Sequence, residues 1–154
     1  VGAAMEMAKR GEADRIKLVV PDVPAISAHW LRTDVESEDH WSRNEVMRAS
    51  GDGGHIETLK MLCTDWENQF SICDPYVFPG EMPDDLLSKL PECVVLTNEH
   101  CFLRKDAELF ASRLLFHGKL LDFCIRPGIS HYSDIPSVYS DASTILSRVV
   151  KTYL

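Results

Sequence analysis

The apolar residues of this chain fall into two kinds of run: short continuous runs, and longer ones with helical spacing. Three short runs rich in valine, isoleucine and leucine predict strands buried on both faces, at 16–20, 93–97 and 120–125. Pro21 follows the first run and Pro91 precedes the second, and proline is common at such boundaries. The pattern therefore predicts a small sheet of three strands.

The longer runs have apolar residues every three or four positions and predict helices at 3–10 and 104–117, and a last helix that Ser140 or Asp141 caps. A shorter stretch at 84–90 predicts one or two further helical turns, and Gly118 is placed to end the second helix. The residues predicted to face the core are Ala4, Met7 and Ala8 in the first helix, Ala107, Phe110, Ala111, Leu114 and Leu115 in the second, and Ala142, Ile145, Leu146, Val149 and Val150 in the third.

This alternation of apolar strands with helices indicates an α/β protein, with a parallel sheet covered by helices on both faces. Because three strands leave sheet edges that need covering, we expect further strands outside this chain. Between His29 and Phe78 the periodicity is lost among charges, three tryptophans and a glycine-rich turn at 51–54. Helical pieces are expected at 41–49 and 55–62, and this part is predicted to be an irregular helical insertion.

Composition and charge narrow the class of protein. The chain has 154 residues, of which 45% are hydrophobic and 26% charged, as in a globular protein of about one domain. Sixteen basic and 24 acidic residues give a net charge of −8 without a dense basic run, which disfavours binding to nucleic acid or to an anionic membrane surface. No apolar stretch approaches the roughly 20 residues that a membrane span requires.

The five cysteines are an odd number and contain no CxxC spacing, so the sequence indicates neither a disulfide framework nor a zinc ribbon. Reduced thiols in a cytosol-like compartment are the favoured interpretation.

Polar side chains follow two consecutive predicted strands. In open α/β sheets the chemistry lies in loops after the carboxyl ends of strands. Here residues 98–101 follow the strand at 93–97, and residues 127–132 follow the strand at 120–125. Since these strands are close in sequence, we expect them to be neighbours and the two loops to lie side by side.

Four stretches, in the same order, resemble the carboxyl-terminal half of an α/β-hydrolase. Within that fold they are most similar to the hormone-sensitive-lipase-like esterases and arylacetamide deacetylases. Those proteins have a DP and DLxxLPP approach, a TxExDxLRD loop and a PGxxHGF loop. The matching stretches are DP at 74–75, DLLSKLP at 85–91, VVLTNEHCFLR at 94–104 and PGISH at 127–131.

The resemblance implies a partial α/β-hydrolase fold in three parts. Residues 1–28 would be the helix and strand that follow the nucleophile elbow, 29–75 a cap-like insertion, and 76–154 the carboxyl-terminal part of the core. Trp30, Trp41 and Trp66 of the insertion would either line an acyl pocket or pack within the cap.

By the same resemblance, His131 falls on the histidine that takes the proton from a serine nucleophile. The acid that orients this histidine would lie at position 101, but Cys101 stands there, and a thiol stabilises an imidazolium poorly. Glu99 and Asp106 are weak stand-in candidates, because each would need a different side-chain direction. The resemblance therefore implies a triad without its acid.

The nucleophile is also missing from these 154 residues, because no GxSxG turn occurs in them, nor an HGG-type oxyanion loop. We therefore expect the amino-terminal half of the fold to be on another polypeptide, in a larger complex, or in a part of the protein outside this sequence. No cofactor or metal is implied, and a small carboxylic ester is the expected ligand.

Several functions remain open. The favoured one is a degenerate hydrolase that acts as a structural or interaction subunit, and the alternative is an active serine esterase completed by the missing half. Two further alternatives are less favoured. Cys101 could be a nucleophile paired with His131, but a residue at the orienting position faces the wrong side of the imidazole. His100 and Cys101 could be a metal pair, but no second pair has ligand spacing. The least favoured is a self-contained α/β binding domain.

Overall fold

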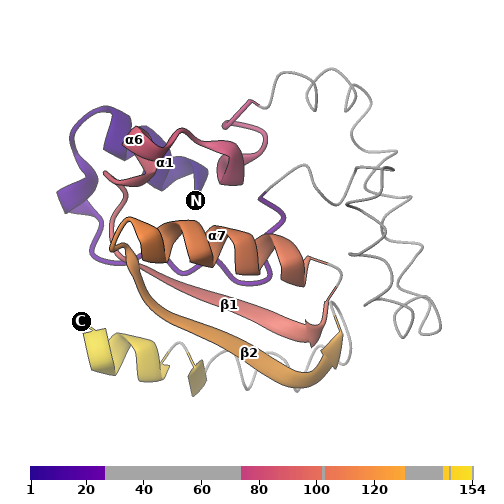
Figure 1. The fold of residues 1–154 in the computed structure, drawn as a ribbon. Coiled ribbons are helices and arrows are strands. Elements are labelled where there is room, and N and C mark those ends of the chain that lie inside the picture. Colours follow the sequence, from indigo (N-terminus) through magenta and orange to yellow (C-terminus); the bar gives the residue numbers. More distant parts are fainter. Residues whose placement is uncertain (27–73, 102, 131–143, 146, 154) are drawn as a thin grey trace.

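The computed structural model describes residues 1–26, 74–101, 103–130, 144–145 and 147–153 (Figure 1). The helical pieces expected within the insertion, its tryptophans and His131 lie outside the described residues.

The sheet is parallel. Strand β1 (Cys93–His100) pairs with strand β2 (Leu120–Ser130), and on its other side β1 is bridged in parallel by Val19 and Asp22. The backbone N–H of Val94 donates to the carbonyl of Val19 at 2.9 Å. The predicted order and parallel direction are thus confirmed for β1 and β2, whereas the first predicted strand, at 16–20, is present only as isolated parallel bridges at Val19 and Asp22.

Two strands extend further than predicted. β1 continues to His100 instead of ending at 97, and β2 continues to Ser130 instead of ending at 125. The polar residues added at these ends remain paired across the two strands, with Asn98 opposite Arg126. The pairing of the two strands therefore extends beyond the apolar runs from which the strands were predicted.

The helices follow the predicted pattern: α1 (Gly2–Lys9), α6 (Asp84–Leu87), α7 (Arg104–Phe116) and a carboxyl-terminal helix that includes residues 144–145 and 147–153. Short 3-10 turns lie at Ala13–Arg15 (η1) and Pro79–Glu81 (η3). Gly118, with φ +65°, follows the end of α7 as predicted, because this backbone conformation disfavours residues with a side chain.

The core lies on both faces of the sheet. Cys93 and Val95 pack on one face beneath α1, α6 and α7, whereas Val94 and Leu96 pack on the other against Val149 of the carboxyl-terminal helix. In Figure 1, α7 (orange) and this helix (yellow) lie on opposite sides of β1 and β2. The predicted covering of both faces is confirmed.

Three details of the predicted helix faces are wrong. Leu115 is 66% exposed and Val150 is 51% exposed, because the sheet covers a narrower arc of each helix than the apolar pattern suggested. In α1, Met5 is fully buried while Met7 is half-buried, since α6 packs beside the helix and its Leu86 and Leu87 join the same core cluster.

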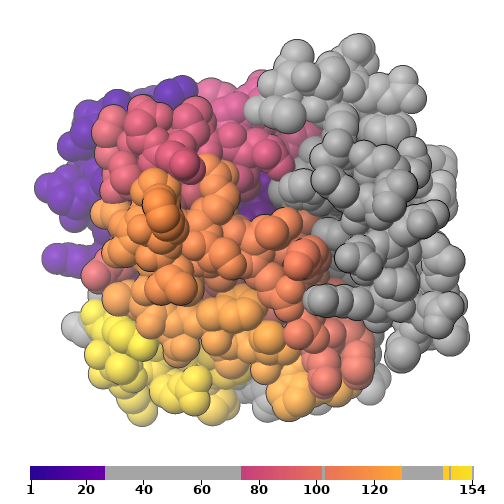
Figure 2. All heavy atoms as spheres, in the orientation of Figure 1, coloured from indigo at the N-terminus to yellow at the C-terminus, as the bar shows by residue number. Residues whose placement is uncertain are grey.

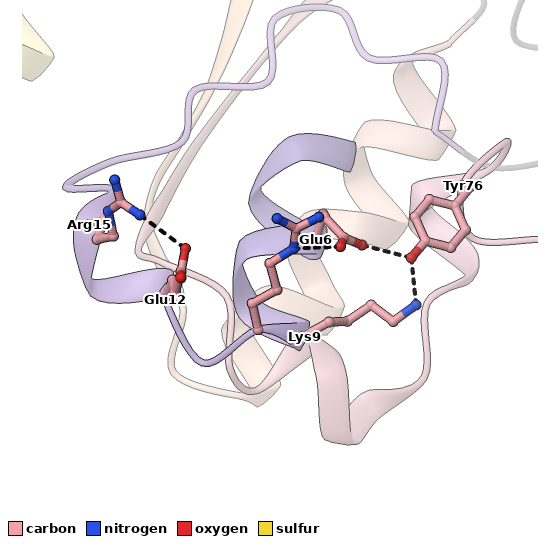
Figure 3. A network of polar contacts seen from close by, with 6 residues as sticks. Glu6, Lys9, Glu12, Arg15 and Tyr76 are labelled. Carbon is pink, nitrogen blue, oxygen red and sulfur yellow. Dashed lines mark hydrogen bonds and ion pairs between the residues drawn. The ribbon is translucent and has the colours of Figure 1, made fainter.

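A polar network joins α1 to the segment that leads into η3 (Figure 3). The Tyr76 hydroxyl donates to Glu6 Oε2 at 2.7 Å and accepts from Lys9 Nζ at 2.6 Å. These hydrogen bonds lower the pKa of Glu6 and raise that of Lys9. The network therefore connects residues close to the start of the chain with the return from the predicted insertion.

Candidate active site

The carboxyl ends of β1 and β2 lie side by side, as expected from the sequence. Asn98 is the Cα partner of Arg126, and His100 is the Cα partner of Ser130. Polar residues thus gather at one end of the sheet, which is where open α/β sheets carry their chemistry.

Arg126 lies buried at this edge and was not singled out by the sequence analysis. Its side chain is 3% exposed, and its Nε donates to Asn98 Oδ1 at 2.6 Å. The same guanidinium pairs with the carboxylate of Asp22, donating from Nη1 to Oδ2 at 3.2 Å and from Nη2 to Oδ1. A buried charge requires such partners. A lone arginine at the end of an apolar run was the sequence signal that could have revealed this network.

Cys101 directly follows β1 and is 2% exposed. Its backbone N–H donates to the carbonyl of Asn98 at 3.2 Å, while its Sγ accepts from the backbone N–H of Leu103 at 3.3 Å. A backbone N–H at the start of a helix favours a negatively charged acceptor. The side-chain position at 101 is therefore suited to a carboxylate, although it holds a thiol.

Glu99 turns its carboxylate to the neighbouring strand. Oε2 accepts from the backbone N–H of Gly128 at 2.7 Å and lies 3.9 Å from His100 Nε2. The main-chain carbonyl of Glu99 accepts from Arg104 Nη1 at 3.1 Å. Glu99 thus joins the end of β1 to the PG pair of β2.

Asp106 lies in the first turn of α7. It is 1% exposed and lines a cavity of about 360 Å³ between α7 and the η3 and α6 segment, with Ile26, Gly80 and Phe110 among the other lining residues. In Figure 2, α7 crosses the middle of the visible face, with the segment around α6 above it.

The fourth predicted site residue, His131, lies outside the described residues. It follows Ser130, whose Cα partner is His100, and Cys101 follows His100. The structure therefore brings the residues that precede positions 101 and 131 together.

Among the described residues, no group of three or more histidine, cysteine or acidic side chains is arranged to hold a metal ion. None of the helices in this part of the chain is long and apolar enough to span a membrane. None of the three cysteines at described positions, Cys93, Cys101 and Cys124, forms a disulfide with another described cysteine.

No known family model matches the sequence, and no curated protein matches it. Solved structures do. Esterase Est22 has a TM-score of 0.69 at 22% identity, over 98% of this chain and 44% of that one. Brefeldin A esterase, a bacterial homologue of human hormone-sensitive lipase, has a TM-score of 0.68 at 24% identity, over 92% of this chain and 40% of that one. An esterase of the fungus Rhizomucor miehei has a TM-score of 0.67 at 18% identity, over 99% and 47%.

These similarities confirm the predicted partial α/β-hydrolase fold, and the three solved structures are esterases, one of them a homologue of hormone-sensitive lipase. The chain spans less than half the length of each of them. At such identities the likeness shows the fold, and the roles assigned to His131 and Cys101 stay predictions.

Proposed function

We propose that this chain carries the histidine and acid positions of a carboxylic-ester hydrolase, His131 and Cys101, and that the thiol at the acid position leaves turnover weak or absent. The protein then serves as a structural or interaction subunit. The observation that carries this proposal is the buried Cys101 at the end of β1, one residue beyond the pairing of His100 with Ser130.

The physical argument concerns charge. In a Ser-His-acid triad the carboxylate fixes the imidazole tautomer and stabilises the imidazolium that forms during the reaction. A neutral thiol carries no charge and accepts hydrogen bonds weakly. In serine proteases, replacing the orienting Asp by Asn lowers turnover by about 10⁴, and we expect a penalty of similar order from Cys101.

One of the two stand-in carboxylates has a backbone partner. Glu99 accepts the Gly128 N–H at 2.7 Å. This contact supports loss of the acid over its replacement by Glu99.

One edge of the sheet, as far as the described residues show it, has no strand beside it, which supports the need for a further sheet partner. Val19 and Asp22 bridge to β1, and within the described residues no backbone hydrogen bond joins the opposite edge of this segment to another strand. We propose that the remaining strands, with the nucleophile and oxyanion hole, come from the rest of the protein or from another polypeptide. The ligand would be an ester with a small or medium acyl group, and no cofactor is needed.

The test uses the whole protein and p-nitrophenyl acetate or butyrate. Cys101→Asp should raise the rate of hydrolysis by about 10²–10⁴, because the carboxylate takes the Leu103 N–H and restores the missing charge. Cys101→Ser is the matched control, neutral and of similar size, and should leave the rate low. No increase from a well-folded Cys101→Asp protein would contradict the assignment of His131.

The active esterase is the second candidate, favoured by the Leu103 N–H that still points at side chain 101. It predicts that the wild-type whole protein labels stoichiometrically with a fluorophosphonate probe. Such labelling would exclude the degenerate subunit. An unlabelled protein that co-purifies with a second polypeptide would support it.

A further inference from the structure

The pairing of β1 with β2 is interrupted close to the proposed site. Asn98 pairs with Arg126, and the next pair is His100 with Ser130. One residue of β1, Glu99, therefore lies opposite three residues of β2, at 127–129. Extra residues of this kind form a bulge, and bulges beside active sites commonly redirect a side chain.

Glycine makes this bulge possible. Gly128 has φ +68°, a conformation that residues with a side chain rarely adopt. A residue within a bulge loses its ladder partner. The N–H of Gly128 instead donates to Glu99 Oε2 at 2.7 Å, within the range of a charge-assisted hydrogen bond. The side chain opposite the bulge thus supplies the acceptor that the ladder lacks.

The chain before the bulge is fixed by Arg126. Its buried guanidinium is bound to Asn98 of β1 and to Asp22 of the next segment, so the residue that enters the bulge is held by two neighbouring segments of the sheet. Glu99 holds the middle of the bulge through the Gly128 N–H, and the ladder resumes at the pairing of His100 with Ser130.

We propose that Glu99 is a positioning residue: by holding the N–H of Gly128, it sets the direction in which the chain leaves β2 and presents His131, three residues later. The inference rests on the proposed role of His131 and assigns Glu99 a function other than that of a substitute acid. Because the Glu99 side chain is 43% exposed, its removal should cost little stability while altering the position of the following residues.

Activity is measured in the Cys101→Asp whole protein, where turnover is expected. Glu99→Ala should lower kcat about 10²-fold, the order associated with a misplacement of about 1 Å, with KM within about twofold. Glu99→Gln should recover most of the rate, since its amide oxygen can accept the same N–H. Glu92→Ala removes the same charge at the exposed amino end of β1 and should have no effect.

The result that overturns the inference is equal damage by Glu99→Gln and Glu99→Ala, since an amide can replace a hydrogen-bond acceptor but cannot replace the triad acid. An unchanged kcat in Glu99→Ala would overturn it as well.

A second readout does not depend on turnover. NMR spectra are compared for the whole protein with Cys101 unchanged. Glu99→Ala should shift the backbone amide resonance of Gly128 and the amide and imidazole resonances of His131. Glu99→Gln should shift them less. If Cys101→Asp fails to restore activity while these shifts occur, the proposed function fails and the positioning contact stands. If the His131 resonances do not move, the positioning role is wrong whatever the activity.

Discussion

Arg126 Nε donates to Asn98 Oδ1 at 2.6 Å, joining the carboxyl ends of β2 and β1 within the protein. The same side chain, 3% exposed, reaches Asp22 at the end of the neighbouring segment. One guanidinium thus connects three parallel segments at the edge where the proposed site lies.

We expect Arg126→Met to lower the free energy of unfolding by about 1–3 kcal/mol, because the buried Asn98 oxygen loses its donor. Methionine keeps much of the side-chain length, so the charge and its hydrogen bonds are the main loss. Urea denaturation measures the difference. Arg10→Met is the control: it breaks an exposed pair with Glu6 and should change the free energy of unfolding much less than Arg126→Met does. Equal effects of the two substitutions would contradict the structural role of Arg126.

Thr97 offers a substitution that should stabilise the protein. Its side chain is fully buried in β1, and its hydroxyl has no hydrogen-bond partner in the described part of the chain. Valine has the same shape without the polar atom, so Thr97→Val should raise the free energy of unfolding by about 1 kcal/mol. Thr97→Ser keeps the hydroxyl and loses a buried methyl, and should destabilise. Thermal unfolding of both variants checks the sign.

Gly80 packs against the main chain of Ile26. Its N–H donates to the Ile26 carbonyl oxygen at 2.5 Å, and a Cβ added at this glycine would lie 2.7 Å from that oxygen. Gly80→Ala should therefore destabilise the fold by about 1–3 kcal/mol. Gly2→Ala is the matched control in α1, where an added Cβ meets nothing within 4 Å, and should be neutral or slightly stabilising. Chemical denaturation that ranks the two variants in the opposite order would contradict the close approach.

Cys93 should make stability depend on alkaline pH. Burial raises the pKa of its thiol from 9.0 to about 11, and its S–H donates to the Pro91 carbonyl at 3.3 Å. Between about pH 9 and pH 11 the unfolded chain loses this proton while the folded protein keeps it. Since the folded state then binds more protons, stability falls as pH rises through this range, by up to about 3 kcal/mol.

The check is the free energy of unfolding measured from pH 8 to pH 11 for the wild type and Cys93→Ala. The variant lacks the titrating group, so the difference between the two curves isolates the thiol. Parallel curves would show that Cys93 titrates alike in the folded and unfolded states.

The local pattern of apolar residues was sufficient to predict helices and strands, because these elements follow short-range periodicity. The apolar run at 93–97 predicted β1, and the helical spacing at 104–117 predicted α7. The same spacing was misleading for Leu115, which is 66% exposed, because the width of the buried face depends on what packs against the helix.

The candidate site was predicted in part. Resemblance of the PGISH and TNEHC stretches directed attention to Cys101, Glu99 and His131, and the register of β1 with β2 brings the first two to the expected edge. What the carboxylate of Glu99 contacts could not be predicted, because its partner, Gly128, lies 29 residues away in the chain. Arg126 and Asp22 are 104 residues apart, and nothing in the sequence indicates that they form a pair.

The sequence alone determined the α/β class, the order and parallel direction of β1 and β2, and the cysteine at position 101, because apolar periodicity and residue identity are local properties. Tertiary structure decided where the strands end, which helix residues remain exposed, and the contacts of Glu99 and Arg126. Those features depend on groups distant in the chain meeting at fixed distances, and only the folded arrangement of β1, β2 and the segment around Asp22 brings them together.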